Sequence, residues 1–141
     1  MEEQKILNRE IEKRNFKRGG EVSSELKELL RKLGVDSKVR RKAAIVAYEM
    51  EMNVIIHSEG GFIKVIIDQK GIKIIASDRG PGIEDLEKAL QPGFSTASDE
   101  IRELGFGAGM GLNNIKNYSD EFNIESNTEQ GTTVEVRLLL K

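Results

Sequence analysis

The sequence contains no cysteine, no tryptophan and only two prolines. Without cysteine, the chain has no disulfide, no thiolate metal site and no thiol nucleophile, which fits a reducing compartment. It also lacks an apolar run long enough to span a bilayer and an N-terminal secretory segment. The formal net charge is only −2, so nothing attracts the whole chain to nucleic acid or to an anionic membrane. We therefore expect a cytoplasmic protein that binds neither directly.

The pattern of apolar residues predicts an α/β domain. A length of 141 residues fits one domain covering residues 1–141. Helical spacing of apolar residues predicts helices over 22–33, 37–57, 83–90 and 112–118. Runs rich in β-branched residues predict strands over 62–67, 72–76, 122–126 and 132–140. The first 16 residues fit either an edge strand or a short helix. Ser23 or Ser24 is expected to cap the first helix, and Asp36 or Ser37 the second.

A glycine-rich stretch directly precedes the predicted helix 112–118. Its glycines alternate with other residues, at Gly105, Gly107, Gly109 and Gly111, and Leu112 follows. Glycine lets the backbone approach a ligand closely, and a helix start offers unpaired N–H groups and partial positive charge. The stretch therefore favours a phosphate site, although a flexible loop would have the same composition.

The long predicted helix carries a carboxylate and an amide on one face. Glu49 and Asn53 are four residues apart, so they lie on the same side of the helix, among mostly apolar neighbours. Such groups need polar partners when they face a core. They are either exposed surface residues, or a base beside an amide oxygen that ligates a hard cation such as Mg²⁺. Glu51 points elsewhere and is expected at the surface.

A second carboxylate follows the predicted strand 72–76. Asp78 precedes a turn containing Gly80 and Gly82, so it can meet a ligand at the strand end. It would accept a hydrogen bond from an exocyclic amine such as that of adenine, or else act as a turn cap for the next helix. Thr132, at the start of the last strand, offers a hydroxyl that would assist Asp78. The segment 91–104 lacks a clear period and would suit a lid over the ligand.

In this order, the motifs resemble the sequence boxes of the Bergerat-fold (GHKL) ATPases. The resemblance rests on Glu49-x-x-x-Asn53, Asp78-x-Gly80-x-Gly82, the glycine stretch ending at Leu112, and Gly131-Thr132, and it covers most of the chain. It implies a two-layer α/β sandwich in which helices cover one face of a mixed, mostly antiparallel sheet. It also implies ATP and Mg²⁺ as cofactors.

The resemblance is strongest to the bacterial anti-sigma-factor and switch kinases of partner-switching pathways. It rests on the runs Tyr48–His57, Gly93–Thr96 and Gly131–Val134. Such kinases transfer the γ-phosphoryl group of ATP to a serine or threonine of an antagonist protein. They also bind a sigma factor or another regulatory protein, and dimers are common among them, so a homodimer is one expectation.

The resemblance implies roles for individual residues. Glu49 would be the catalytic base, Asn53 the Mg²⁺ ligand and Asp78 the adenine contact. Gly80 and Gly82 would border the base, and Thr132 would support Asp78. The phosphates would be wrapped by the glycine stretch and the leucine that follows it, that is, by Gly105, Gly107, Gly109, Gly111 and Leu112. The acidic segment before Gly105 departs from the family pattern, so it predicts no lid contacts.

Two other functions use the same residues. One is an ATP-binding regulatory module with little kinase activity. The other is the catalytic fragment of a histidine kinase, which would need a separate helical phosphoacceptor segment, and the short N-terminal region leaves no room for one.

Overall fold

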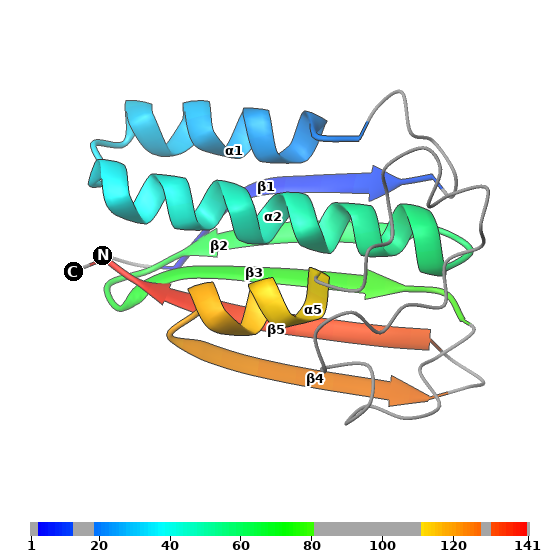
Figure 1. Cartoon of the computed structure of the whole chain (residues 1–141). Helices are drawn as coiled ribbons and strands as arrows, with labels where there is room; N and C mark the ends of the chain where they lie inside the picture. The colour runs from blue at the N-terminus through cyan, green and yellow to red at the C-terminus, as the bar shows by residue number, and fades with distance from the viewer. Residues whose placement is uncertain (1–2, 13–18, 81–110, 128–130, 141) are drawn as a thin grey trace.

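The computed structural model describes residues 3–12, 19–80, 111–127 and 131–140. These residues form three helices and five strands (Figure 1). In chain order they are β1 (Gln4–Ile11), α1 (Glu21–Lys32), α2 (Ser37–His57), β2 (Gly61–Ile67), β3 (Gly71–Asp78), α5 (Gly111–Tyr118), β4 (Glu121–Asn127) and β5 (Gly131–Leu139). The predicted strands and the helices over 22–33, 37–57 and 112–118 are therefore confirmed to within about two residues. The predicted helix 83–90 lies outside the described residues.

The strands form one sheet in the order β1-β2-β3-β5-β4. Every neighbouring pair is antiparallel, so the sheet of the described residues contains no parallel pair. β1 lies at one edge, which confirms the edge-strand alternative for the N-terminal segment. β5 inserts between β3 and β4, so the last strand of the chain lies near the centre of the sheet.

All three helices pack on the same face of the sheet (Figure 1). Alternate residues of the strands point toward them and are buried, as the period of two in a strand requires. α2 contacts α1 on one side, α5 on the other, and the sheet beneath. It buries residues around most of its circumference, including Ala43, Val46, Ala47, Met50, Met52, Val54 and Ile55. This two-layer arrangement confirms the predicted α/β sandwich, and α2 is its central helix.

The start of α1 differs from the prediction. Its N-cap is Gly20, with a φ of 97°, and neither Ser23 nor Ser24 caps the helix. The cap comes instead from α2, where Glu51 Oε1 accepts a hydrogen bond from the Gly20 N–H at 3.0 Å. Glu51 is only 2% exposed, so the prediction that it lies at the surface is wrong. A buried carboxylate is tolerated here because the helix start supplies N–H donors and partial positive charge.

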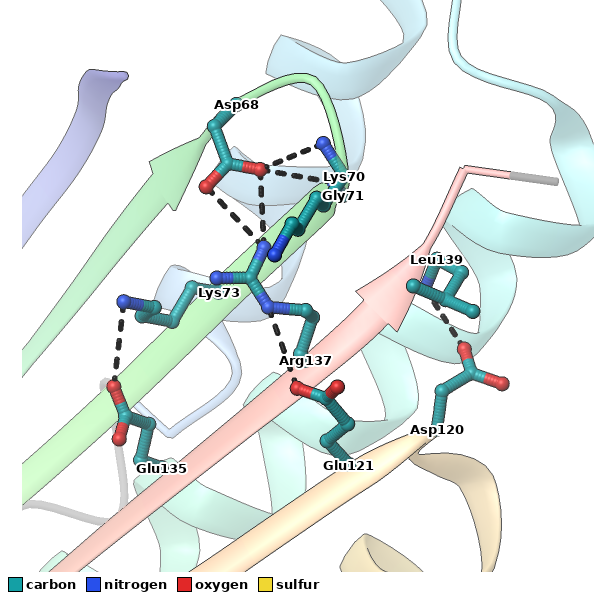
Figure 2. A network of polar contacts seen from close by, with 9 residues as sticks. All are labelled: Asp68, Lys70, Gly71, Lys73, Asp120, Glu121, Glu135, Arg137 and Leu139. Atoms are coloured by element: carbon teal, nitrogen blue, oxygen red, sulfur yellow. Dashed lines mark hydrogen bonds and ion pairs between the residues drawn. The ribbon is translucent and has the colours of Figure 1, made fainter.

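A polar network lies at the end of the sheet where a turn joins β2 to β3 (Figure 2). The Arg137 guanidinium on β5 donates to the Asp68 carboxylate at 3.0 Å and also pairs with Glu121 of β4. Asp68 Oδ1 accepts from the N–H groups of Lys70 and Gly71 as well, which closes the turn. The network therefore ties β4, β5 and the β2–β3 turn together on the face opposite to the three helices.

Candidate functional site

Several predicted site residues lie at the end of the sheet remote from the polar network. β3 ends there with Asp78, β5 begins there with Gly131, and α5 starts near the same end (Figure 1). Antiparallel pairing of β3 with β5 brings Asp78 and Thr132 together, although they are 54 residues apart in the chain. The topology thus assembles a site from residues that are distant in sequence.

Asp78 is anchored to the start of β5. Its Oδ1 accepts a hydrogen bond from the Thr132 N–H at 2.9 Å. Burial raises the pKa of the Asp78 carboxyl, and the Thr132 N–H offsets part of that effect. The prediction placed the Thr132 hydroxyl beside Asp78, but the contact runs through the backbone, and the hydroxyl pairs with Ser126 Oγ on β4 at 2.8 Å. Thr132 itself is buried, at 8% exposure.

Gly131 leaves room for this arrangement. Its φ of 109° is strained for any residue with a side chain. A Cβ atom at this position would lie 2.4 Å from the Asp78 carbonyl oxygen and 2.7 Å from the Gly80 nitrogen. Gly131 therefore lets the start of β5 approach the Asp78–Gly80 segment closely. The sequence motif pairs Gly131 with Thr132, but it contains no sign of the approach of Gly131 to Gly80.

Glu49 lies on α2, where α5 packs against it. The side chain is half-buried rather than exposed on the helix surface. Burial raises the pKa of the Glu49 carboxyl, and a side-chain hydrogen bond from Asn114 of α5 lowers it in part. Asn114 was not predicted as a site residue. Its distance of three residues from Gly111 was the available signal, since residues three apart share a helix face.

The remaining predicted residues divide into two groups. Asn53 is half-buried one turn after Glu49 on α2, and Leu112 packs against the core from the start of α5. Gly80 ends the described segment after β3, and Gly111 begins α5. The others lie outside the described residues: Gly82, Gly105, Gly107, Gly109 and the predicted lid 91–104.

The described donor set suits a nucleotide with a metal ion better than a metal ion alone. Within the described residues, no group of three or more histidine or acidic side chains is placed to hold a metal. An amide oxygen such as that of Asn53 can contribute one ligand to Mg²⁺, which takes its other ligands from phosphate and water. The half-buried Asp78 carboxylate, when ionised, only accepts hydrogen bonds, as recognition of an amino group requires.

Comparison with known protein families shows to which family the chain belongs. A family model described as a histidine kinase-like ATPase domain matches residues 17–138. The chain belongs to the histidine kinase-like ATPase family. This membership confirms the predicted ATPase superfamily, and it implies the use of ATP.

Curated relatives from this family carry regulatory names. The chain is 32% identical over 109 residues to the serine/threonine-protein kinase RsbT of Bacillus subtilis (strain 168), covering 74% of this chain and 76% of RsbT. It is 35% identical over 102 residues to an anti-sigma F factor of Anoxybacillus flavithermus, covering 72% and 63% of the two chains. An anti-sigma F factor of Thermoanaerobacter sp. is 43% identical over 72 residues, which are 51% and 47% of the two chains. The chain thus spans about half to three quarters of these relatives.

The structure contains no helix of the kind that crosses a bilayer, within the part of the chain that it describes. The longest described helix is α2, and it is the central helix of the domain.

Proposed function

We propose that this chain is an ATP-dependent serine/threonine kinase of a partner-switching pathway, formed by one domain over residues 1–141. It would phosphorylate an antagonist protein and bind a sigma factor or another regulatory protein. The proposal is supported by family membership and by similarity to RsbT and to anti-sigma F factors. The structural observation that best supports phosphoryl transfer is the half-buried Glu49 carboxylate, which lies one helical turn from Asn53.

Asp78 would recognise the base of ATP. One carboxylate oxygen is occupied by the Thr132 N–H, and this contact fixes the plane of the carboxylate. The carboxylate retains acceptor capacity for the amino group of adenine, whereas the carbonyl oxygen of guanine would be repelled. Gly80 and Gly131 keep bulky side chains away from this position, and Gly82 would extend the same border.

The start of α5 would bind the phosphates. Gly111 begins the helix, so its first N–H groups have no partner within the helix. Together with Leu112 and the preceding Gly105, Gly107 and Gly109, they would surround the phosphate chain. Asn53 would supply an oxygen ligand to Mg²⁺, which in turn would neutralise charge on the transferred phosphoryl group.

Glu49 would act as the base. The serine or threonine oxygen of the antagonist forms a bond to the γ-phosphorus while the bond from that phosphorus to the β–γ bridging oxygen breaks. The hydroxyl proton passes to the Glu49 carboxylate, and ADP leaves. Burial raises the pKa of Glu49 toward the range in which a carboxylate accepts a proton more readily.

Glu49→Gln tests this role, because it keeps the shape of the side chain and removes the base. We expect unchanged ADP affinity by calorimetry and a transfer rate from labelled ATP to candidate antagonist proteins that is lower by about 10²- to 10⁴-fold. Asn53→Ala should lower both the ADP affinity and the transfer rate. Glu51→Gln is the matched control, since Glu51 is a buried glutamate on the same helix that faces α1 instead.

The outcome separates the proposal from the ATP-binding regulatory module. If the parent protein binds ADP and transfers no phosphate to any candidate antagonist, the module is the correct description. If Glu49→Gln transfers phosphate at the parent rate, Glu49 is not the base. A phosphorylated histidine on the partner would instead support the histidine kinase fragment.

A further inference from the structure

We propose that the outer face of the helical hairpin formed by α1 and α2 is a docking surface for an acidic, amphipathic segment of a regulatory partner protein. The inference deepens the function proposed above: it rests on that function for the existence of a partner, and it adds the surface and the chemistry that the partner must match. Three observations carry it, namely the charge of the hairpin, the side chains on its outer face, and the place of this face in the fold.

The hairpin is basic, although the chain as a whole is slightly acidic. Residues 26–42, from the middle of α1 to the first half of α2, contain seven lysines and arginines but only two acidic residues. Their net charge is +5 while that of the whole chain is −2, so the remaining residues carry −7. A surface of one sign attracts partners of the opposite sign and speeds their association. The hairpin is therefore suited to an acidic partner.

The packing of the two helices brings cations from both of them together. Ser23 Oγ of α1 donates a hydrogen bond to the Ala44 carbonyl oxygen of α2 at 2.8 Å, and this contact fixes the register of the two antiparallel helices (Figure 1). Lys27 lies about one turn further along α1, and the pair Arg40–Arg41 lies about one turn back along α2. Lys27 is thus opposite these arginines, and the basic surface extends across both helices.

The outward face of α2 places apolar side chains beside these cations. Its exposed cations are Lys38, Arg41 and Lys42. Ile45, which is half-buried, and Tyr48, which is 37% exposed, follow at helical spacing. Among the described residues, none of the three cations forms an ion pair. The face therefore offers unpaired positive charge next to apolar surface, which complements a helix that carries glutamates beside leucines.

The charge around the hairpin favours a protein segment over a nucleic acid or a bilayer. A DNA duplex or an anionic membrane is larger than the hairpin, so it would also approach the remainder of the chain with its charge of −7. A short acidic helix can be confined to the basic surface, and its apolar side chains would cover Ile45 and Tyr48. A tyrosine suits this role, because aromatic side chains are enriched among the residues that dominate binding at protein interfaces.

The docking surface lies away from the candidate nucleotide site. The α1–α2 connection lies at the end of the molecule that contains the β2–β3 turn, whereas β3 reaches Asp78 at the opposite end (Figure 1). Tyr48 is the residue of the surface nearest to Glu49 in sequence, and it faces α1, where its ring would lie 3.7 Å from a Cβ atom on Gly20. A partner on the hairpin would therefore leave the nucleotide end accessible. We expect the same ADP affinity with the partner segment bound or absent.

The test uses the full chain and a synthetic helical peptide of about fifteen residues, with leucines along one face and glutamates elsewhere. A peptide with lysines in place of the glutamates is the control probe. Calorimetry should show a Kd of about 10–100 µM for the acidic peptide. Binding should weaken as salt rises from about 0.05 M to about 0.5 M, and the basic peptide should not bind. In amide NMR spectra, the acidic peptide should shift signals of α1 and of the first half of α2, and leave those of Asp78 and Thr132 unchanged.

Charge reversal provides matched variants on exposed positions. Lys38→Glu and Arg41→Glu should each raise the Kd of the acidic peptide by about tenfold, because they place like charges against each other. Tyr48→Ala should have an effect of about the same size, since it removes the aromatic contact. Lys116→Glu is the control: Lys116 is an exposed lysine on α5, and its reversal changes the net charge by the same amount. It should leave the Kd near the parent value.

Several results would overturn the inference. One is the absence of binding at about 1 mM acidic peptide. Others are amide shifts confined to the end with Asp78, and equal losses in Arg41→Glu and Lys116→Glu. Tighter binding of duplex DNA or of phosphatidylserine vesicles than of the peptide, lost in Arg41→Glu, would assign the surface to a different partner.

The proposed function fails or stands separately. If the parent protein transfers no phosphate but binds the acidic peptide on the hairpin, the docking surface stands and the kinase assignment is wrong. If the protein phosphorylates an antagonist and does not bind the peptide, the kinase assignment stands and the docking surface is wrong.

Discussion

The carboxyl groups at the two ends of the sheet have pKa values shifted in opposite directions. At the β2–β3 turn, Asp68 is paired with Arg137, and the Gly71 N–H, followed by the Arg137 side chain, holds the pKa of Asp68 below its usual value (Figure 2). At the other end, burial raises the pKa values of Asp78 and Glu49. Among the described residues, neither of these two carboxylates forms an ion pair with a lysine or arginine.

From this difference we expect that the network end of the sheet serves stability and that the end with Asp78 and Glu49 serves binding. The network end satisfies its charges within the chain, so it needs no ligand. The other end retains carboxylates whose charge is opposed by burial, which is typical of residues that act on a substrate or cofactor. Substitutions at the two ends should accordingly change different properties.

The largest contrast should come from Asp78→Asn and its counterpart Asp68→Asn. Asp78→Asn should lower ADP affinity by about 10- to 100-fold, the loss expected for a hydrogen bond to a charged group. It should not lower stability without nucleotide, since the amide oxygen still accepts from the Thr132 N–H and the half-buried charge is removed. Asp68→Asn should lower the melting temperature and leave ADP affinity intact. Calorimetry measures the ADP affinity and thermal unfolding measures the melting temperature of each variant. If Asp68→Asn lost ADP affinity and Asp78→Asn lost stability, the comparison between the two ends would be wrong.

Gly131→Ala tests the close approach at the binding end. The added Cβ would meet the Asp78 carbonyl oxygen and Gly80, and the backbone would be strained as well. We expect a loss of about 1–3 kcal/mol in the free energy of unfolding, and weaker ADP binding. Gly34→Ala is the control, because Gly34 also has a positive φ but no neighbouring atom within 4 Å. Equal losses in denaturant titrations would show that the contact with Asp78 is unimportant.

Arg137→Met probes the network end. It keeps most of the packing of the side chain but leaves Asp68 without its guanidinium partner. We expect a melting temperature lower by a few degrees, because the Arg137 side chain is only 14% exposed and its pairing with Asp68 is shielded from water. Arg31→Met should have almost no effect, since that side chain is 59% exposed and pairs with Glu28 on the surface of α1. Similar melting curves for both variants would contradict the assignment of the network to stability.

The smallest effect should be a difference in how the stability of the Asp68 and Asp78 variants depends on pH. The pKa of Asp68 is lowered from an ordinary value of 3.8, so its contribution to stability is present above that pH and is lost as the pH falls through the folded-state pKa. The pKa of Asp78 is raised from the same ordinary value, so its contribution is present below 3.8 and is lost as the pH rises through the folded-state pKa. Urea titrations across the acid range should therefore show a weaker acid loss in Asp68→Asn and a smaller decline with rising pH in Asp78→Asn. Parallel curves for both variants and the parent would oppose these assignments.

Much of the fold could be predicted because the signals were local. β-branched runs separated by short turns specified the strands, and Asp36 preceded α2 as a local cap, accepting from Lys38 N–H. The motif order then indicated the family. The strand order was harder, because the position of β5 between β3 and β4 depends on pairing between residues far apart in sequence.

The sequence-based predictions that were wrong concern contacts between segments that are distant in the chain. The cap of α1 comes from Glu51, thirty-one residues beyond Gly20, so no local capping pattern reveals it. A signal did exist, since Ala47 and Ile55 lie one turn on either side of Glu51 and both are buried. The pairing of the Thr132 hydroxyl with Ser126 likewise depends on the β4–β5 register, which the sequence did not specify.

The edges of the sheet have a consequence for self-association. β1 contains a register shift between Lys5 and Leu7, where Ile6 is the extra residue, and such a bulge prevents regular addition of another strand. β4, at the other edge, carries exposed Glu121 and Glu125. Two such edges brought together would place like charges against each other. The protein therefore has a barrier to fibril-like growth at each side of its sheet, which helps a regulatory protein to remain dispersed when its concentration rises.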